Sequence, residues 1–259
     1  MYDLIISKLP ERDFFTGYMT AAVITALILM IIAEYKLNLR MIIIAAIASV
    51  CTATAGIGGK IAGKIIYGAM LDPAGFINNF GVYEGTHFIG RAIYIILLSF
   101  ILWKIIMRRD SGTFGKTGYG RFSDILSLYM FVHVLIVRTG CLSAGCCYGK
   151  PYNGLFSVIA TGVPYSVMPA VYTEMVITAI AFAVGIVMFI RKRNVFVIFG
   201  MGYPLAVFVS EFMYDRMGSV YVCGLTGAQW LALLLAAMCI IISQCIPEKK
   251  SRFIFKQIR

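Results

Sequence analysis

The sequence predicts an all-α integral membrane protein with seven transmembrane helices, organised as a single domain over residues 1–259. Hydrophobic residues fill 60% of the 259 positions and charged residues only 14%. The mean hydropathy is +0.86, which is too apolar for a soluble domain of this length. Apolar runs of spanning length recur along the whole chain, and no alternating strand pattern of a membrane barrel is visible.

The predicted spans share one property, which is an apolar run near the length that a membrane helix needs. Helices are favoured because a backbone group without a hydrogen-bond partner is costly in lipid. The first run follows a mixed acidic and basic segment and is long enough to stay in the membrane, so we expect no cleaved signal peptide. In chain order the spans cover residues 14–34, 41–69, 87–107, 122–138, 166–190, 195–213 and 227–246.

The basic residues predict the orientation. When the 23 Lys and Arg residues are assigned to alternate sides of the membrane, fifteen fall on the side of the carboxyl terminus and four on the other. The remaining four lie within spans or at their ends. The positive-inside rule then places the amino terminus outside and the carboxyl terminus in the cytoplasm. The net charge of +11 is scattered over four loops, so we expect no nucleic-acid partner.

Seven titratable residues lie in the spans or at their ends, where such residues are expensive and functional by default. Lys60 and Lys64 share one helix face and His87 and Arg91 share another, because residues four apart are neighbours on a helix. The predicted orientation puts all seven in the outer half of the membrane. They are Lys60, Lys64, His87, Arg91, Arg138, Glu174 and Glu211. This pattern predicts a pocket that opens to the outer leaflet and binds an anion with an apolar body, such as a phospholipid.

Each of these residues also has a structural interpretation. The two lysines could extend their side chains to the lipid head groups, and His87 could be a hydrogen-bonded packing residue. Arg138 could form a structural ion pair with Glu174 or Glu211. The convergence of several charges in one half of the membrane favours the binding site.

The segment at residues 138–149 reads RTGCLSAGCCYG. It resembles the signature of the prolipoprotein diacylglyceryl transferase family, Arg-x-Gly-Asn-Phe-x-Asn-x-Glu-x-x-Gly, over all twelve positions without a gap. Arg138, Gly140 and Gly149 match, and Tyr148 stands where an aromatic residue is usual. The departures are Cys141, Ala144 and Cys146, which replace two asparagines and a glutamate.

Other segments resemble the family in the same chain order. The stretch GGKIAGKIIY (58–67) has Lys60 at a family arginine, and in THFIG (86–90) His87 either matches the family histidine or pairs with a glycine of that motif. Val207 departs from the family because it occupies the position of an arginine. The later positions that match are Pro169, Glu174, Tyr203, Glu211 and Phe212.

The resemblance implies a function. The family moves diacylglycerol from phosphatidylglycerol to the cysteine thiol of a lipoprotein precursor, and glycerol phosphate is released. It implies a multi-pass protein of the bacterial cytoplasmic membrane whose partners are a phospholipid and a precursor peptide. The reaction requires no metal or other cofactor.

The resemblance and the chemistry together assign expected roles. Arg138 is the first choice for the phosphate because a planar guanidinium offers two parallel donors, and His87 is the expected base for the acceptor thiol. Glu211 completes the expected catalytic set with these two residues. The expected substrate-binding residues are Lys60, Arg91, Gly140, Gly145, Gly149, Tyr148, Glu174 and Tyr203. Arg91 or Lys60 would supply a second cation, and Glu174 and Glu211 would orient the cations. The glycines would let the loop turn and bring its amides to a ligand.

The outer cysteines have three interpretations. A disulfide could join two outer loops, with Cys223 paired to Cys141 or Cys146. Alternatively, one of the group Cys141, Cys146, Cys147 and Cys223 could be a reactive thiol, or these residues could bind a metal with His87, for which the spacing is poor. We expect Cys51, Cys239 and Cys245 to be small residues within helices, and His133 to be a packing residue.

Two rival functions stay open at this stage. A small-solute transporter or sulfur-relay membrane protein would use the outer thiols, although the cytoplasmic halves of the spans hold almost no charge and no inverted repeat is visible. A catalytically silent relative that binds lipid would keep the fold and lose the transfer. The departures from the family motifs keep this second possibility in view.

Overall fold

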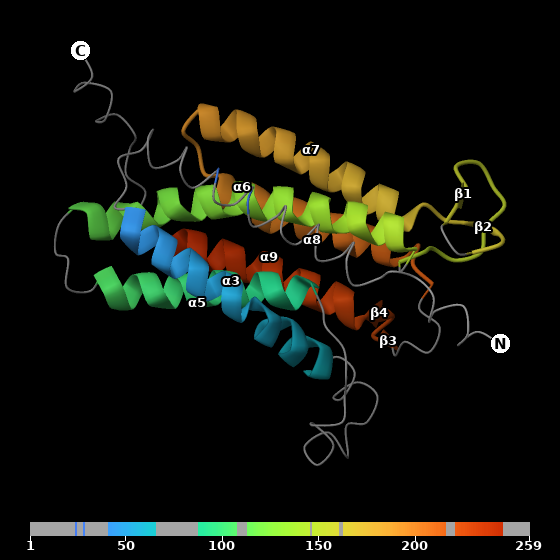
Figure 1. The fold of residues 1–259 in the computed structure, drawn as a ribbon, viewed down its shortest axis with the longest axis horizontal. Coiled ribbons are helices and arrows are strands. Elements are labelled where there is room, and N and C mark those ends of the chain that lie inside the picture. Colours follow the sequence, from blue (N-terminus) through green and yellow to red (C-terminus); the bar gives the residue numbers. More distant parts are fainter. Residues whose placement is uncertain are drawn as a thin grey trace.

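The computed structural model is a bundle of long helices lying side by side (Figure 1). It describes residues 41–65, 88–107, 113–145, 147–160, 163–215 and 221–245, together with Ile24 and Ile28. The predicted span 14–34 therefore lies outside the described residues, apart from those two isoleucines, which are helical.

Helices account for most of the described chain, and each overlaps one predicted span. Four of them are long and apolar enough to cross a membrane, with spanning windows Phe88–Ile105, Gly118–Ser143, Ala170–Ile190 and Gly227–Cys245. The shorter apolar helix Val195–Glu211 lies among them. The bounds are α3 (Met41–Lys64), α5 (Phe88–Met107), α6 (Thr113–Ala144), α7 (Ala170–Ile190), α8 (Val195–Glu211) and α9 (Gly227–Cys245).

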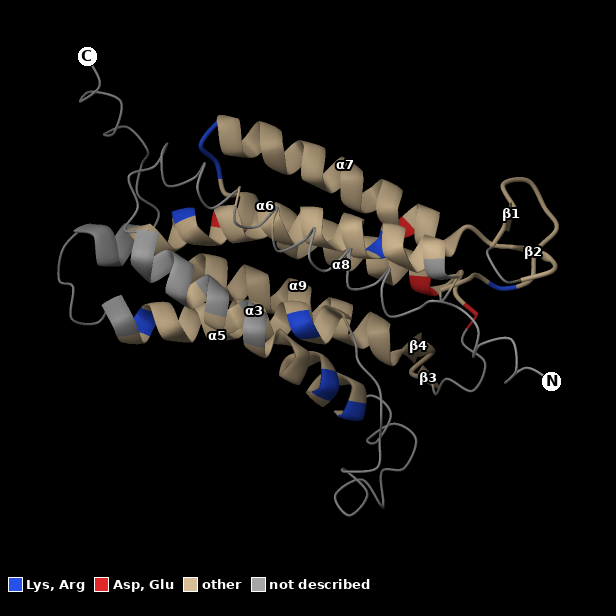
Figure 2. Ribbon diagram, in the orientation of Figure 1, with Lys and Arg blue, Asp and Glu red and all other residues tan. Residues whose placement is uncertain are grey.

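Helix α8 is the centre of the packing, with contacts to α6, α7 and α9, while α5 contacts α9 and α3. Small residues let these helices approach closely, since Gly202 of α8 lies against Ala181 of α7 and Gly200 lies against Cys239 of α9. The rings of Phe131 and Phe199 meet edge to face at 5.1 Å in the core. Figure 2 shows the long helices tan over most of their length, with charged residues at few positions.

Two carboxamide or carboxylate oxygens cap the start of α8. Oδ1 of Asp124, on α6, accepts from the backbone N–H of Val195 at 2.7 Å and of Phe196 at 3.0 Å. Oδ1 of Asn194 accepts from Val197 N at 3.2 Å. These bonds satisfy three of the N–H groups that a helix start leaves without partners, and they join α8 to α6.

Helix α6 is longer than the predicted span 122–138, because it begins at Thr113 and ends at Ala144. Its last turns contain short polar side chains that bond back to the helix. Thr139 Oγ1 donates to Leu135 O at 2.9 Å, and Ser143 Oγ donates to Thr139 O at 3.1 Å. The expectation that Arg138 closes the helix was therefore wrong, since the helix continues through the next six residues.

Two short hairpins add to the predicted all-α fold. Strands β1 (Val158–Ile159) and β2 (Ser166–Val167) pair antiparallel, with Val158 opposite Val167. Strands β3 (Tyr221–Val222) and β4 (Leu225–Thr226) pair in the same way. The first hairpin replaces the start of the predicted span 166–190. It lies beyond the amino-terminal end of α7 (Figure 1).

Candidate functional site

An ion pair between α6 and α7 lies at the centre of the candidate site. Arg138 Nε donates to Glu174 Oε1 at 2.7 Å, and the two side chains are 16% and 0% exposed. Glu174 lies in the second turn of α7. The sequence left Glu174 and Glu211 as alternative partners for Arg138, and the structure selects Glu174.

The second carboxylate oxygen of Glu174 is also occupied. Tyr214 Oη donates to Glu174 Oε2 at 3.0 Å, and Ser210 Oγ donates to the same oxygen at 3.4 Å. Burial, followed by the neighbouring Glu174 carboxylate, raises the pKa of Tyr214 well above its ordinary value, so the phenol keeps its proton and donates. A carboxylate held by three donors orients the guanidinium firmly.

The other edge of the Arg138 guanidinium faces a thiol and a ring. Nη1 approaches Cys147 Sγ at 4.0 Å, and the guanidinium carbon is 6.0 Å from the centre of the Tyr214 ring. Within the described part of the chain, no carboxylate or carbonyl oxygen accepts from the Nη groups. These two groups therefore have donors available for the oxygens of an anion.

Tyr203 of α8 lies close to this ion pair. Its side chain is fully buried, within electrostatic reach of Glu174 and Arg138, and its ring stacks on Phe199 at 5.7 Å. Its hydroxyl has no hydrogen-bond partner among the residues that the structure describes. A buried hydroxyl of this kind is suited to a ligand that brings its own acceptor.

Two of the three predicted loop glycines lie where the backbone requires a residue without a Cβ. Gly145 has a φ of 65°, which ends α6 in a conformation that glycine adopts without strain. Gly149 pairs with Tyr214 in an antiparallel bridge, and a Cβ at this position would overlap Met168. Gly140 does not belong to a loop, because it is a buried residue within α6.

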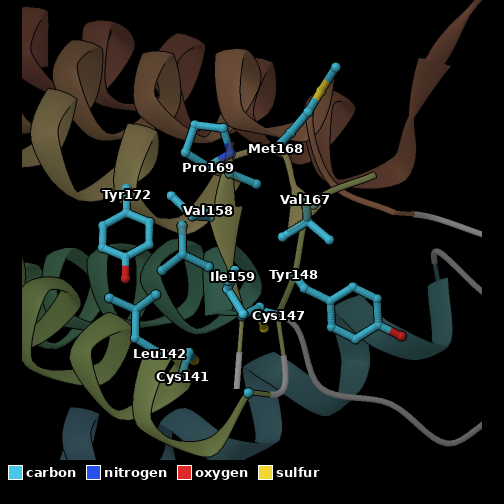
Figure 3. Close-up of a pocket in the computed structure, with 15 residues that line it drawn as sticks. Cys141, Leu142, Cys147, Tyr148, Val158, Ile159, Val167, Met168, Pro169 and Tyr172 are labelled. Carbon is cyan, nitrogen blue, oxygen red and sulfur yellow. The ribbon is translucent and has the colours of Figure 1, made fainter. Parts of the chain in front are cut away.

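Beside Cys147 an open pocket lies between the end of α6, the first hairpin and the start of α7 (Figure 3). Its described lining holds no Lys, Arg, Asp or Glu. Figure 3 shows the side chains of Leu142, Val158 and Tyr172 gathered on one side. Tyr148, which the sequence assigned to substrate binding, lines the same pocket.

The other predicted site residues are not drawn into this cluster. Glu211 is buried and accepts from Thr226 Oγ1 at 3.3 Å, so it contacts β4 rather than Arg138. Lys60 is exposed on α3, and in the described ranges no ion pair joins it or Arg91 to Glu174. Arg91 packs against Gly59, and its Nε is buried without a hydrogen-bond partner among the described residues.

Of the two histidines, one lies in the described core. His87 lies outside the described residues. His133 is buried, stacks on Phe88 at 5.5 Å, and has Nδ1 3.5 Å from Tyr129 Oη. The prediction that His133 is a packing residue is confirmed.

The cysteines do not form the predicted disulfide between Cys223 and Cys141. Cys141 is buried in the last turn of α6, whereas Cys223 is exposed in the turn between β3 and β4. The alternative partner Cys146 lies outside the described residues. Among the described residues, no group of three His, Cys, Asp or Glu side chains is placed to bind a metal. Cys51 and Cys239 are buried core residues as expected, but Cys245 is exposed at the end of α9.

Ser210 and Tyr214 were missed by the sequence reasoning. Ser210 lies seven residues after Tyr203, which is two helical turns, so helical spacing alone could have placed it on the same face of α8. Tyr214 lies beyond the end of α8. Nothing in the local spacing indicates that its hydroxyl reaches Glu174.

The fold and the site define a helical membrane protein in which a half-buried arginine is paired with a fully buried glutamate. The family model of the prolipoprotein diacylglyceryl transferases matches residues 10–244, and the chain belongs to that family. The family consists of membrane transferases that transfer a diacylglyceryl group to a lipoprotein precursor. No curated protein matches the chain in sequence.

Proposed function

We propose that this chain transfers the diacylglyceryl group of a phosphatidylglycerol-like lipid to a thiol acceptor, such as the cysteine of a lipoprotein precursor. The observation that carries the proposal is the Arg138 guanidinium, whose Nε is bonded to Glu174 while its Nη groups keep donors for a ligand. Family membership supports this assignment.

In the proposed reaction the donor phosphate accepts two parallel hydrogen bonds from the Nη groups of Arg138. The acceptor sulfur attacks the glyceryl carbon next to the phosphate oxygen, and that carbon–oxygen bond breaks. The bonding electrons leave with glycerol phosphate, so negative charge collects where the guanidinium is already oriented. The Tyr203 hydroxyl supplies a further donor from the buried side, and we retain Gly145 and Gly149 as residues that shape the loop.

A base must remove the proton from the acceptor thiol, and His87 is the residue that we propose. In the sequence it directly precedes the first residue of α5 and lies four residues before Arg91. Arg91 is the proposed second cation, because its Nε is buried without a described partner. That role would compensate for Val207, which is buried at the position of the family arginine. We retain Lys60 and Glu211 as supporting members of the site.

The proposed reaction also requires a particular orientation of the chain in the membrane. We propose seven spans in a single domain, with the amino terminus outside, in the cytoplasmic membrane of a bacterium. This orientation puts the Arg138–Glu174 pair near the outer surface, where lipoprotein precursors emerge. No cofactor is part of the proposed reaction.

The test replaces Arg138 with lysine. Arg138→Lys keeps a positive charge beside Glu174 and so avoids a buried carboxylate without a counter-ion, but it removes the two-pronged donor. We expect transfer to a cysteine-containing precursor peptide to fall by about 100-fold or more, as when one preorganised donor is removed. Transfer is measured with purified protein and phosphatidylglycerol in detergent.

The matched control is Arg121→Lys, on the same helix and about 25 Å away at 1.5 Å per residue. It should transfer at the wild-type rate. Native mass spectrometry of both variants reports whether phosphatidylglycerol is retained. Wild-type transfer by Arg138→Lys would overturn the proposal, and a wild-type protein that retains lipid but transfers to no peptide would identify a silent relative.

A further inference from the structure

We infer that the pocket between the end of α6 and the first hairpin binds the acceptor peptide, through an apolar side chain that lies close to the acceptor thiol. This inference rests on the proposed function and assigns the peptide-binding part of the same site. Cys147 connects the two regions, since it lines the pocket and its sulfur lies 4.0 Å from Arg138 Nη1. A peptide seated here would present its thiol beside a phosphate held by Arg138.

The lining decides which part of a substrate fits. The fifteen described lining residues include no charged side chain, so the pocket offers a phosphate no cation of its own. Leu142, Val158 and Tyr172 supply apolar surface around the space (Figure 3). The space is open to the surface, so the backbone of a bound peptide can stay outside while one side chain lies against the lining.

The pocket lies nearer to the ends of α6 and α7 than the ion pair does. Along α6 the pocket begins at Cys141, after Arg138, and along α7 it ends at Tyr172, before Glu174. The ion pair therefore lies between the pocket and the middle of the bundle. A peptide that approaches from the surface meets the hairpin first, and its thiol then lies on the side of the pocket that faces Arg138.

The hairpin supports an extended peptide. Strand β1 has a partner strand on one edge only among the described strands, and such an edge can pair with an added peptide strand. The base of the hairpin is held in place because Lys150 N donates to Met213 O at 2.8 Å and Tyr152 N donates to Ser166 O at 2.9 Å. The wall of the pocket is thus built before the peptide arrives.

The first test fills the pocket in the full-length protein. Val158→Trp places a large side chain in the space. The matched control Leu155→Trp adds the same side chain three residues before β1, at a position that is 80% exposed and outside the lining. We expect KM for a peptide with leucine shortly before its cysteine to rise at least tenfold in Val158→Trp only. Phosphatidylglycerol retention should stay within twofold of wild type in both variants. An unchanged peptide KM, or lipid retention lost in parallel, would overturn the inference.

The second test does not require transfer. A peptide with a benzophenone residue in place of the leucine and serine in place of the cysteine is irradiated with the wild-type protein, and mass spectrometry locates the adducts. We expect adducts on Leu142, Val158 or Tyr172. Adducts elsewhere only, or labelling of these residues by a phosphatidylglycerol with a photoreactive acyl chain, would overturn the inference. Peptide adducts here in a protein that transfers nothing would refute the proposed function alone.

Discussion

Glu174 shows how a single residue is held at depth in this bundle. Its side chain is fully buried, and three groups bond to it: Arg138, Ser210 and Tyr214. An ionised carboxylate without partners would be very costly in such a place. The three bonds offset that cost and, at the same time, fix the direction of the guanidinium.

Removal of the Tyr214 hydroxyl tests this arrangement. Tyr214→Phe keeps the ring and leaves Glu174 with one donor fewer, so we expect the free energy of unfolding to fall by about 1–3 kcal/mol and transfer to decrease. Because burial raises the pKa of Tyr214, the difference from wild type should hold up to about pH 10 and shrink as the pH rises further. Chemical unfolding in detergent at a series of pH values measures the free energy of unfolding and its pH dependence.

Tyr221→Phe is the control for that prediction, because Tyr221 is 53% exposed. Loss of the Tyr221 hydroxyl should change the free energy of unfolding by no more than about 0.5 kcal/mol. Equal losses in the two variants would show that the bond to Glu174 adds no specific stability.

The sequence predicted the members of the site better than their partners. A charge within an apolar span is conspicuous, which is why Arg138 and Glu174 were both identified. Which glutamate faces Arg138 depends on the rotation of α7 and α8, and an apolar run with few polar positions does not encode that rotation. Serine and tyrosine are common in membrane helices and their ends, so Ser210 and Tyr214 gave no comparable signal.

At the scale of elements, helix ends were the least predictable feature. Hydropathy marks the part of a helix that lies in lipid, whereas the end of a helix depends on local hydrogen bonds and turn residues. Helix α6 continues past Arg138 until Gly145 adopts a positive φ. The two hairpins were not predicted, because their strands are two residues long and depend on tertiary contacts.

The hairpin base supplies a test at this scale. Gly149 has room only for hydrogen, so the Cβ of Gly149→Ala would overlap the backbone of Met168 and force the loop apart. We expect a loss of about 1–3 kcal/mol in the free energy of unfolding and weaker transfer. Gly56→Ala is the control, since a Cβ there meets nothing within 4 Å and should stabilise the helix by up to about 1 kcal/mol. Thermal unfolding in detergent compares the two, and a stable, active Gly149→Ala would contradict the close fit.

At the scale of the whole molecule, the six described helices follow the predicted order of spans. The sequence predicted them because 60% apolar composition leaves few alternatives to helices in lipid. Which helices touch could not be predicted, since contacts such as Gly202 with Ala181 depend on small residues that occur throughout the chain.

The proposed orientation can be tested on α9, which has one cysteine shortly before its start and another at its last residue. Cys223 and Cys245 are both exposed, and they flank the helix on opposite sides of the bundle. The test uses variants in which Cys223 or Cys245 is the only cysteine of the chain. A membrane-impermeant maleimide, added to intact cells whose outer membrane or cell wall has been made permeable, should modify Cys223. It should modify Cys245 only after the membrane is permeabilised. The reverse pattern would place the amino terminus in the cytoplasm.

The bridge between Gly149 and Tyr214 couples the spacing of two loops to the position of a buried carboxylate. Tyr214 provides the backbone partner of one loop and also the hydroxyl that holds Glu174. The two loops cannot separate far without loosening the carboxylate that aims the guanidinium. Because one residue makes both contacts, a movement that separates the two loops would also release the guanidinium of Arg138 from its fixed direction.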